Sequence, residues 1–326
     1  MKRILIFLGV TFGLTWAYEF GVVYPAASGA LEGIPPIAAQ LATGAAMFFP
    51  AIGVLITRLV TREGFKNSMI KPRGFKKAAP WFAVAWFGPA ILATVGAAVY
   101  YLVFPQDFDP SMSTTIATQQ QAAVAAGAGD IPADQLRTML LAQLPVALLL
   151  SPALNIFTTF GEEWGWRGYL VPKVSTHMKI VPTLLVTGVI WGLWHAPLTI
   201  IGHNYGVGYP GWPFAGIAAM CVFCIVMGIF LTYVTVHTGS VLAAAIGHGA
   251  INGFLAAATF FSVTGGNPFV GPLSVGIVGG SAFIVAAAFM LLDLHRREKA
   301  GTLNMPKAGL PDDVTKADVT REGGAC

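Results

Sequence analysis

Long apolar runs separated by short polar connections extend along the chain to about residue 292. A helix that crosses the hydrocarbon core of a bilayer needs about 20 such residues, and each run comes close to that length. The pattern predicts about eight spans, at approximately residues 4–24, 36–60, 79–104, 142–171, 181–203, 214–236, 241–263 and 273–292. The predicted fold class is therefore all-α, a polytopic membrane protein. It comprises a transmembrane domain over residues 1–299 and a flexible cytoplasmic tail over residues 300–326.

The composition supports this class. Hydrophobic residues make up 55% of the 326-residue chain and charged residues only 10%, and the mean hydropathy is +0.69. A soluble protein of this length cannot bury so much apolar surface. The net charge of +4 comes from scattered basic residues, which excludes a nucleic-acid face and makes the lipid bilayer the expected partner. Cys221 and Cys224 lie in an apolar run, where packing is the expected role.

Charges in the connections predict the orientation of the spans. The basic connections are those before the first span, between the second and third, after the fourth and after the eighth; the first two hold Lys2, Arg3, Arg58, Arg62, Lys66, Lys71, Arg73, Lys76 and Lys77. The connection over 105–137 is acidic, and the stretches 204–213 and 264–272 carry no charge. Both termini are therefore expected in the cytoplasm of a multi-pass cell-membrane protein. The first run also fits a signal peptide, but no small-residue cleavage site closes it, which favours a true span.

Two other segments lack apolar periodicity. The "TQQQAAVAAGAGD" stretch within 105–137 predicts a mobile external loop with some helix, and the tail is rich in Gly, Pro and charge. No internal repeat is found, so the inverted-repeat architecture of transporters gains no support.

Ionisable residues within spans are costly and therefore indicate function. In "GEEWGWRGYL", Glu163 and Arg167 are four residues apart and fall on one helix face as an ion pair. Glu162 points about 100° away and has no partner in its own helix, so it is left for another role. The helical positions therefore predict that Glu163 and Arg167 have a structural role and that the carboxylate of Glu162 is the chemically active one.

Two further clusters carry imidazoles. Trp191 and His195 share a helix face, and His248 and Asn252 lie one turn apart. A glutamate facing an imidazole suits activation of a water, and an imidazole beside an amide suits an oxyanion site. If the fourth span runs on to about residue 171, the three groups fall at compatible depths. By contrast, Glu19, His203 and His237 lie near span ends, and an interfacial position is expected for each.

These residues resemble a known family. Glu162-Glu163-x-x-x-Arg167, then an aromatic-x-x-x-His motif ending at His195, then His248-x-x-x-Asn252, are similar to the motifs of the CPBP intramembrane proteases. That family includes the type II CAAX prenyl proteases and the bacterial bacteriocin-processing and self-immunity proteins. The resemblance covers about residues 140–260. The second motif usually begins with Phe, where this chain has Trp191, and packing is the role expected there.

The resemblance implies an endopeptidase that hydrolyses a peptide bond of a membrane-associated or lipid-modified, CAAX-like protein or peptide. Glu162 and His195 would activate water, and His248 with Asn252 would stabilise the oxyanion. Glu163 and Arg167 would support the site. The chain lacks H-E-x-x-H, so glutamate-type catalysis without a metal is favoured, although Glu162, His195 and His248 are the ligands if zinc is used.

Other interpretations stay open from the sequence. A catalytically idle scaffold or self-immunity protein of the same fold is the main alternative, and the intact motif residues argue against it. In a proton-coupled transporter, Glu162 and the histidines would relay protons. Glu162 and His248 fall in the cytoplasmic halves of their predicted spans, which favours substrate access from the cytoplasm.

Overall fold

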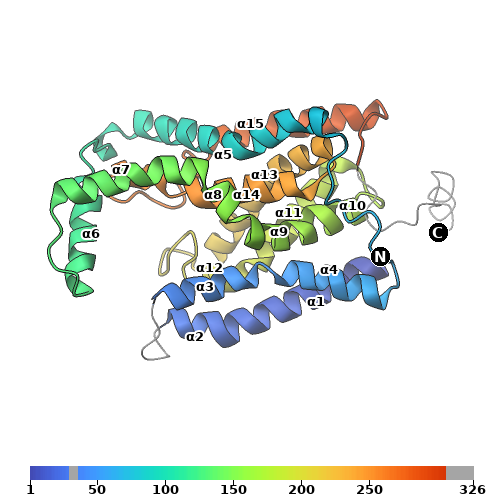
Figure 1. Cartoon of the computed structure of the whole chain (residues 1–326), viewed down its shortest axis with the longest axis horizontal. Helices are drawn as coiled ribbons and strands as arrows, with labels where there is room; N and C mark the ends of the chain where they lie inside the picture. The colour runs from blue at the N-terminus through green and yellow to red at the C-terminus, as the bar shows by residue number, and fades with distance from the viewer. Residues whose placement is uncertain (29–35, 306–326) are drawn as a thin grey trace.

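The computed structural model describes residues 1–28 and 36–305, which form helices joined by turns (Figure 1). The predicted tail lies mostly outside the described residues. The α-helices are α1 Lys2–Tyr18, α2 Tyr24–Ala27, α3 Pro36–Ala46, α4 Phe49–Val60, α5 Phe75–Val103, α6 Ser113–Ala125, α7 Ala133–Leu149, α8 Ser151–Leu154, α9 Ile156–Gly165, α10 Val171–Val174, α11 Ile180–Trp194, α12 Ala196–Ile200, α13 Phe214–Thr238, α14 Val241–Phe254 and α15 Ser281–Lys299. The π-helices are η1 Glu19–Val23 and η3 Trp166–Leu170, and the 3₁₀ turns are η2 Pro105–Asp107 and η4 Ala257–Phe261. Within these described ranges there is no strand, and the all-α prediction is confirmed.

Five helical segments among the described residues are long and apolar enough to cross a membrane: Lys2–Ala27, Gln40–Val60, Phe75–Val103, Phe214–Thr238 and Val241–Phe261. They match five of the predicted spans. The multi-pass class is thus confirmed, but the count of eight is not.

The other three predicted spans are helical but shorter or more polar. The helix of the fourth is broken around Leu150 and Asn155, and that of the fifth ends at Trp194. The eighth begins only at Ser281, because residues 273–280 form turns, and it ends in a charged segment.

The helix that carries the glutamates does reach the depth that the site requires. From Ile156, α9 continues through η3 into α10 and ends at Val174, so Pro172 does not stop it. The π-helical turn lies directly after the two glutamates, and such insertions are frequent at functional sites.

The stretch 105–137 is more ordered than predicted. Its alanine-rich part forms α6, and α7 begins at Ala133. The two helices share a small core of Met112, Ile116, Leu136 and Leu140. Alanine and glutamine favour helix, which explains why this low-complexity segment is helical.

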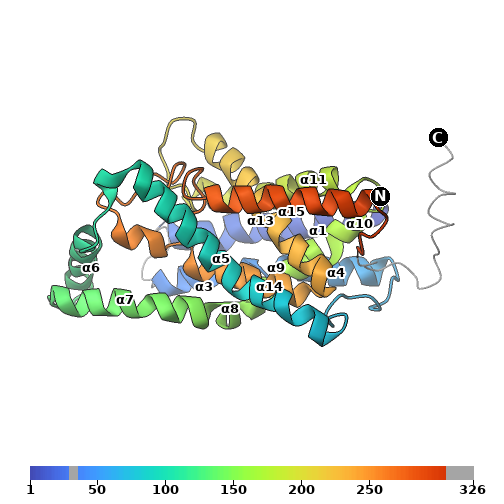
Figure 2. The ribbon, with the colours of Figure 1, turned by 90° about the horizontal axis from the view of Figure 1, so that it is seen from above.

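Most of the helices run lengthwise, with α6 lying across one end, so the bundle has two ends (Figures 1 and 2). We call the end with Lys2, Val60, Val174, Thr238 and Lys299 the terminal end, and the end with α2, α6, α12 and the start of α13 the distal end. Met1 and His177 meet at the terminal end, with 3.4 Å between the amino nitrogen and Nε2. The first and last helices both have an end there, as an even number of passes requires.

Close packing of α11 on α13 fixes the position of the following histidine. A Cβ on Gly188 would lie 2.7 Å from the Cα of Ile225, and one on Gly192 would lie 2.4 Å from the Cα of Cys221. Glycines at this spacing let two helix backbones approach closely in a membrane. His195, three residues after Gly192, is therefore held against α13.

Candidate active site

The two glutamates of α9 take different partners. The Glu163 carboxylate lies 2.9 Å from the Arg167 guanidinium, and both side chains are buried. The predicted ion pair is confirmed. Glu162 is also buried, but it forms no ion pair among the described residues. A buried charge without a partner is costly, so the loss of either Glu163 or Arg167 alone would destabilise the fold around the site.

Glu163 has a second contact that the sequence did not suggest. His248 Nδ1 lies 2.8 Å from the same Oε1 atom that binds Arg167. Because a carboxylate only accepts, Nδ1 carries the proton and donates it to Glu163. Glu163 therefore joins α9 to α14 and orients the His248 ring.

Glu162 is held by two tryptophans. The indole N–H of Trp191 donates to Glu162 Oε1, and that of Trp166 lies 3.3 Å from the same oxygen. Trp191 also packs its ring under the Arg167 guanidinium, 4.0 Å from the ring centroid. Trp191 was expected only to pack, and its donated hydrogen bond is a further role that a Phe in its place cannot fill.

His195 lies at the break between α11 and α12. Its Nδ1 is 2.9 Å from the Trp191 carbonyl oxygen, so Nδ1 donates and a neutral ring keeps Nε2 as an acceptor. Among the described residues, no hydrogen bond joins His195 to Glu162 directly. The two meet instead as walls of one cavity.

That cavity has a volume of about 360 Å³ and we call it the Glu162 cavity. Glu162, His195, His248 and Asn252 all line it, whereas Glu163 and Arg167 do not. Side chains from α9, the α11–α12 junction and α14 thus converge on one space. Helical phase predicted that Glu162 and the Glu163–Arg167 pair would face different ways, but Trp191, expected only to support the site, also lines the cavity.

The region that carries these groups matches a known family. Residues 144–254, about a third of the chain, match the family model described as type II CAAX prenyl endopeptidase Rce1-like. These residues form an Rce1-like domain. Its bounds agree with the expected 140–260, and the family supports a membrane-embedded protease. No curated protein matches the chain in a sequence search.

The Rce1-like domain holds a histidine that the sequence placed at the interface. His203 lines the Glu162 cavity, and its ring is parallel to that of His195 at 6.2 Å between centroids. His237 does stay away from the cavity, with its ring against Trp81 at 3.9 Å. The sequence does not show that His203 lines the cavity while His237 does not. His203 reaches the cavity because the turn after α12 brings it back toward His195.

Glu19 was also expected at the interface, and this is wrong. It is 1% exposed, and neither of its carboxyl oxygens has a hydrogen-bond partner. It begins the π-helical turn that continues α1, and Trp16, one turn earlier, donates to the Trp194 carbonyl. The packing of α1 on the Rce1-like domain explains its burial.

Zinc binding by Glu162, His195 and His248 is the alternative that the sequence left open. Among residues 1–28 and 36–305, no three His, Cys, Asp or Glu side chains come together in a group that fits a metal ion. Glu162, His195 and His248 are not gathered as such a group in this structure.

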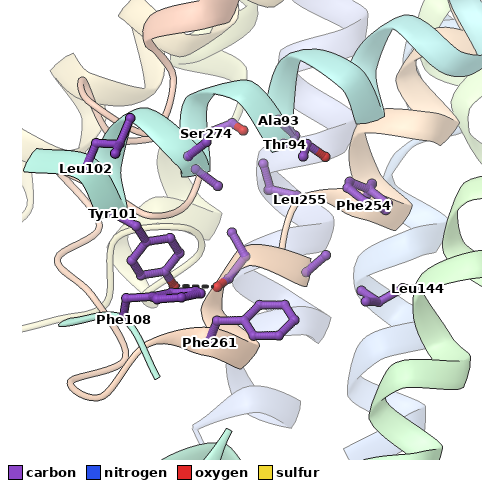
Figure 3. A pocket seen from close by; sticks show the side chains of 14 residues that line it. Ala93, Thr94, Tyr101, Leu102, Phe108, Leu144, Phe254, Leu255, Phe261 and Ser274 are labelled. Atoms are coloured by element: carbon purple, nitrogen blue, oxygen red, sulfur yellow. Dashed lines mark hydrogen bonds between the residues drawn. The ribbon is translucent and has the colours of Figure 1, made fainter. Parts of the chain in front are cut away.

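A second cavity adjoins the first (Figure 3). It has a volume of about 540 Å³ and lies between α5, α7, η4 and the end of α14; we call it the apolar cavity. Its lining is almost entirely apolar, and the hydroxyl of Tyr101 is turned to the Ala258 carbonyl at 2.7 Å. Leu255 lines both cavities, so it marks the place where they adjoin.

Proposed function

We propose that the protein is an intramembrane endopeptidase that hydrolyses a peptide bond of a lipid-modified or membrane-associated substrate without a metal. The observation that carries the proposal is the convergence of Glu162, His195, His248 and Asn252 on one cavity within an Rce1-like domain. A carboxylate, two imidazoles and an amide are the groups that activation of water and stabilisation of an oxyanion require.

The hydrogen bonds at the two Nδ1 atoms support different roles for the histidines. The Nδ1 of His195 faces a neutral carbonyl, so its Nε2 is an acceptor suited to holding a water. The Nδ1 of His248 faces the Glu163 carboxylate, which is a counter-ion for an imidazolium. An imidazolium offers a second donor at Nε2, and that donor suits an oxyanion.

The proposed reaction follows from these roles. Glu162 takes one proton from water, while His195 accepts a hydrogen bond from its other hydrogen. The water oxygen bonds to the peptide carbonyl carbon, and the resulting oxyanion accepts hydrogen bonds from His248 and the Asn252 amide. Glu162 then returns the proton to the leaving nitrogen as the C–N bond breaks, which gives a carboxylic acid and an amine. The proton of the acid then passes to the amine, so the products leave as a carboxylate and an ammonium group.

The apolar cavity supports a lipid-modified substrate. An apolar space of this size suits a hydrocarbon chain, which gains free energy in proportion to the apolar area it buries. Its boundary with the Glu162 cavity at Leu255 allows one substrate to occupy both.

The test is cleavage of a quenched fluorescent, lipid-modified peptide by the purified protein in detergent, with the same peptide lacking its lipid as the control. We expect cleavage of the lipidated peptide that survives a chelator. Loss with chelator and recovery with zinc would overturn the metal-independent reaction. Absence of cleavage of the peptide would favour the idle scaffold or self-immunity protein instead.

A further inference from the structure

The Glu162 cavity extends toward the distal end of the bundle, not toward the terminal end as the sequence suggested. Thr43 and Gly44 belong to α3, which begins at the distal end, and Met220 and Phe223 lie within about ten residues of the distal start of α13. The lining also includes His203 and Asn204, in the turn after α12. The cavity thus runs from Glu162, at mid-depth, away from the chain termini.

Buried groups close the terminal end below the site. Glu63 accepts a hydrogen bond from the Tyr169 hydroxyl at 2.9 Å, is paired with Lys173, and lies 3.3 Å from Arg3 Nε. The Tyr169 ring contacts Phe7 at 5.2 Å between centroids. This cluster spans α1, the turn after α4, η3 and α10, and it separates Glu162 from the terminal surface.

The two ends differ in charge. The terminal end carries basic residues in the connections 61–74 and 175–179 and at the end of α15. The distal end carries Asp107, Asp109, Asp130 and Asp134 with Arg137 alone opposing them. Short basic connections stay in the cytoplasm, so the terminal end faces the cytoplasm and the distal end faces away from it.

We infer that the substrate enters from the non-cytoplasmic side and is a membrane-anchored peptide displayed there. The inference rests on the proposed function for its substrate. The apolar cavity lies at the same depth, since its α5 lining runs from Ala93 to Leu102, in the distal half of that helix. The lipid of such a peptide would therefore insert from the non-cytoplasmic leaflet. An export step must precede the cleavage.

Cysteine labelling tests the side of entry. Val207 is exposed in the turn next to the cavity, and Thr302 is exposed after α15 at the terminal end. Val207→Cys and Thr302→Cys are near-isosteric changes and would be made in a Cys326→Ser background. The Cys326→Ser protein without a new cysteine measures the background labelling of Cys221 and Cys224.

The label is a membrane-impermeant maleimide, applied to spheroplasts before and after lysis. We expect Val207→Cys to label equally in both, and Thr302→Cys labelling to rise about tenfold on lysis. The opposite pattern would overturn the inference. Equal labelling of both positions before lysis would also overturn it, because the protein would then lack a fixed orientation.

Cleavage gives the second readout. The quenched lipid-modified peptide, coupled to a large carrier protein that cannot cross the membrane, is added to intact and lysed spheroplasts, with Glu162→Gln as the blank. Equal rates support entry from outside, and cleavage only after lysis overturns it. Absence of cleavage in both would count against the proposed function, while the labelling would still decide the orientation.

Discussion

His248 Nδ1 lies 2.8 Å from Glu163 Oε1, the atom that also binds Arg167. One carboxylate oxygen therefore holds a cation of its own helix and an imidazole of another. The second carboxyl oxygen of Glu163 is buried without a partner among the described residues. Glu163 thus orients the His248 ring, although it does not line the cavity.

Glu163→Gln should destabilise the protein more than Glu162→Gln. The change leaves the Arg167 guanidinium buried without its counter-ion, which costs about 3 kcal/mol in comparable pairs. Glu162 is not paired with a cation, so its replacement should have a small effect on stability. Thermal unfolding of both variants in the same detergent measures the difference, and equal unfolding temperatures would contradict the roles assigned to the two residues.

Trp191→Phe should lower kcat about tenfold, because it removes one hydrogen bond to a charged group while a ring remains over Arg167. Trp166→Phe is the matched control. It removes the longer contact of 3.3 Å to the same oxygen, and a smaller effect is expected. An unchanged kcat in Trp191→Phe would mean that the indole N–H does not contribute to the reaction.

Leu255→Trp should separate the two cavities. The larger side chain fills the place where they adjoin, so cleavage of the lipidated peptide should fall about tenfold while cleavage of any accepted unlipidated peptide changes little. Leu255→Met, which nearly conserves volume, should behave as the wild type. Equal losses on both peptides would count against a lipid site in the apolar cavity.

Asp107 should contribute stability that depends on pH. Burial disfavours its charged form, but hydrogen bonds from Ser262 and Thr264 outweigh burial and hold the pKa of this carboxyl below its usual value. A carboxyl with a lowered folded pKa stabilises the protein above its unfolded value of about 3.9, and this contribution is lost as the pH falls through the folded value.

Asp107→Asn should therefore cost about 1–2 kcal/mol at pH 7, and the difference from the wild type should shrink below about pH 4. Thermal unfolding between pH 3 and pH 7, a range set by the unfolded value of about 3.9, measures this. Asp130→Asn is the control, because Asp130 is exposed and its loss should have little effect. A penalty for Asp107→Asn that does not vary with pH would contradict the account.

Helical phase and span length predicted the fold class, the Glu163–Arg167 pair and the separation of Glu162 from that pair. These features depend on period and spacing within single helices, which the sequence contains directly. The number of spans was harder to predict from the sequence. Apolar residues continue without a gap through Ser151-Pro152 and through 273–280, but the helices are interrupted at both places.

Contacts between helices could not be predicted from the sequence. The bond from His248 to Glu163 and the burial of Glu19 depend on which helices pack together, and residues far apart in the chain do not encode that in a readable pattern. The position of His203 depends on a turn whose direction no motif specifies. The contribution of α3, α12 and α13 to the lining of the Glu162 cavity likewise depends on how these helices pack.

In the proposed reaction, Glu162 takes the proton from the attacking water. The most direct measurement is the ratio of cleavage rates of wild type and Glu162→Gln on the lipidated peptide, at matched amounts of folded protein. The amide retains the shape of the carboxyl but cannot accept that proton, so the rate should fall by about 10²–10⁴ with little change in the unfolding temperature. A Glu162→Gln variant that is folded and cleaves at the wild-type rate would contradict the account.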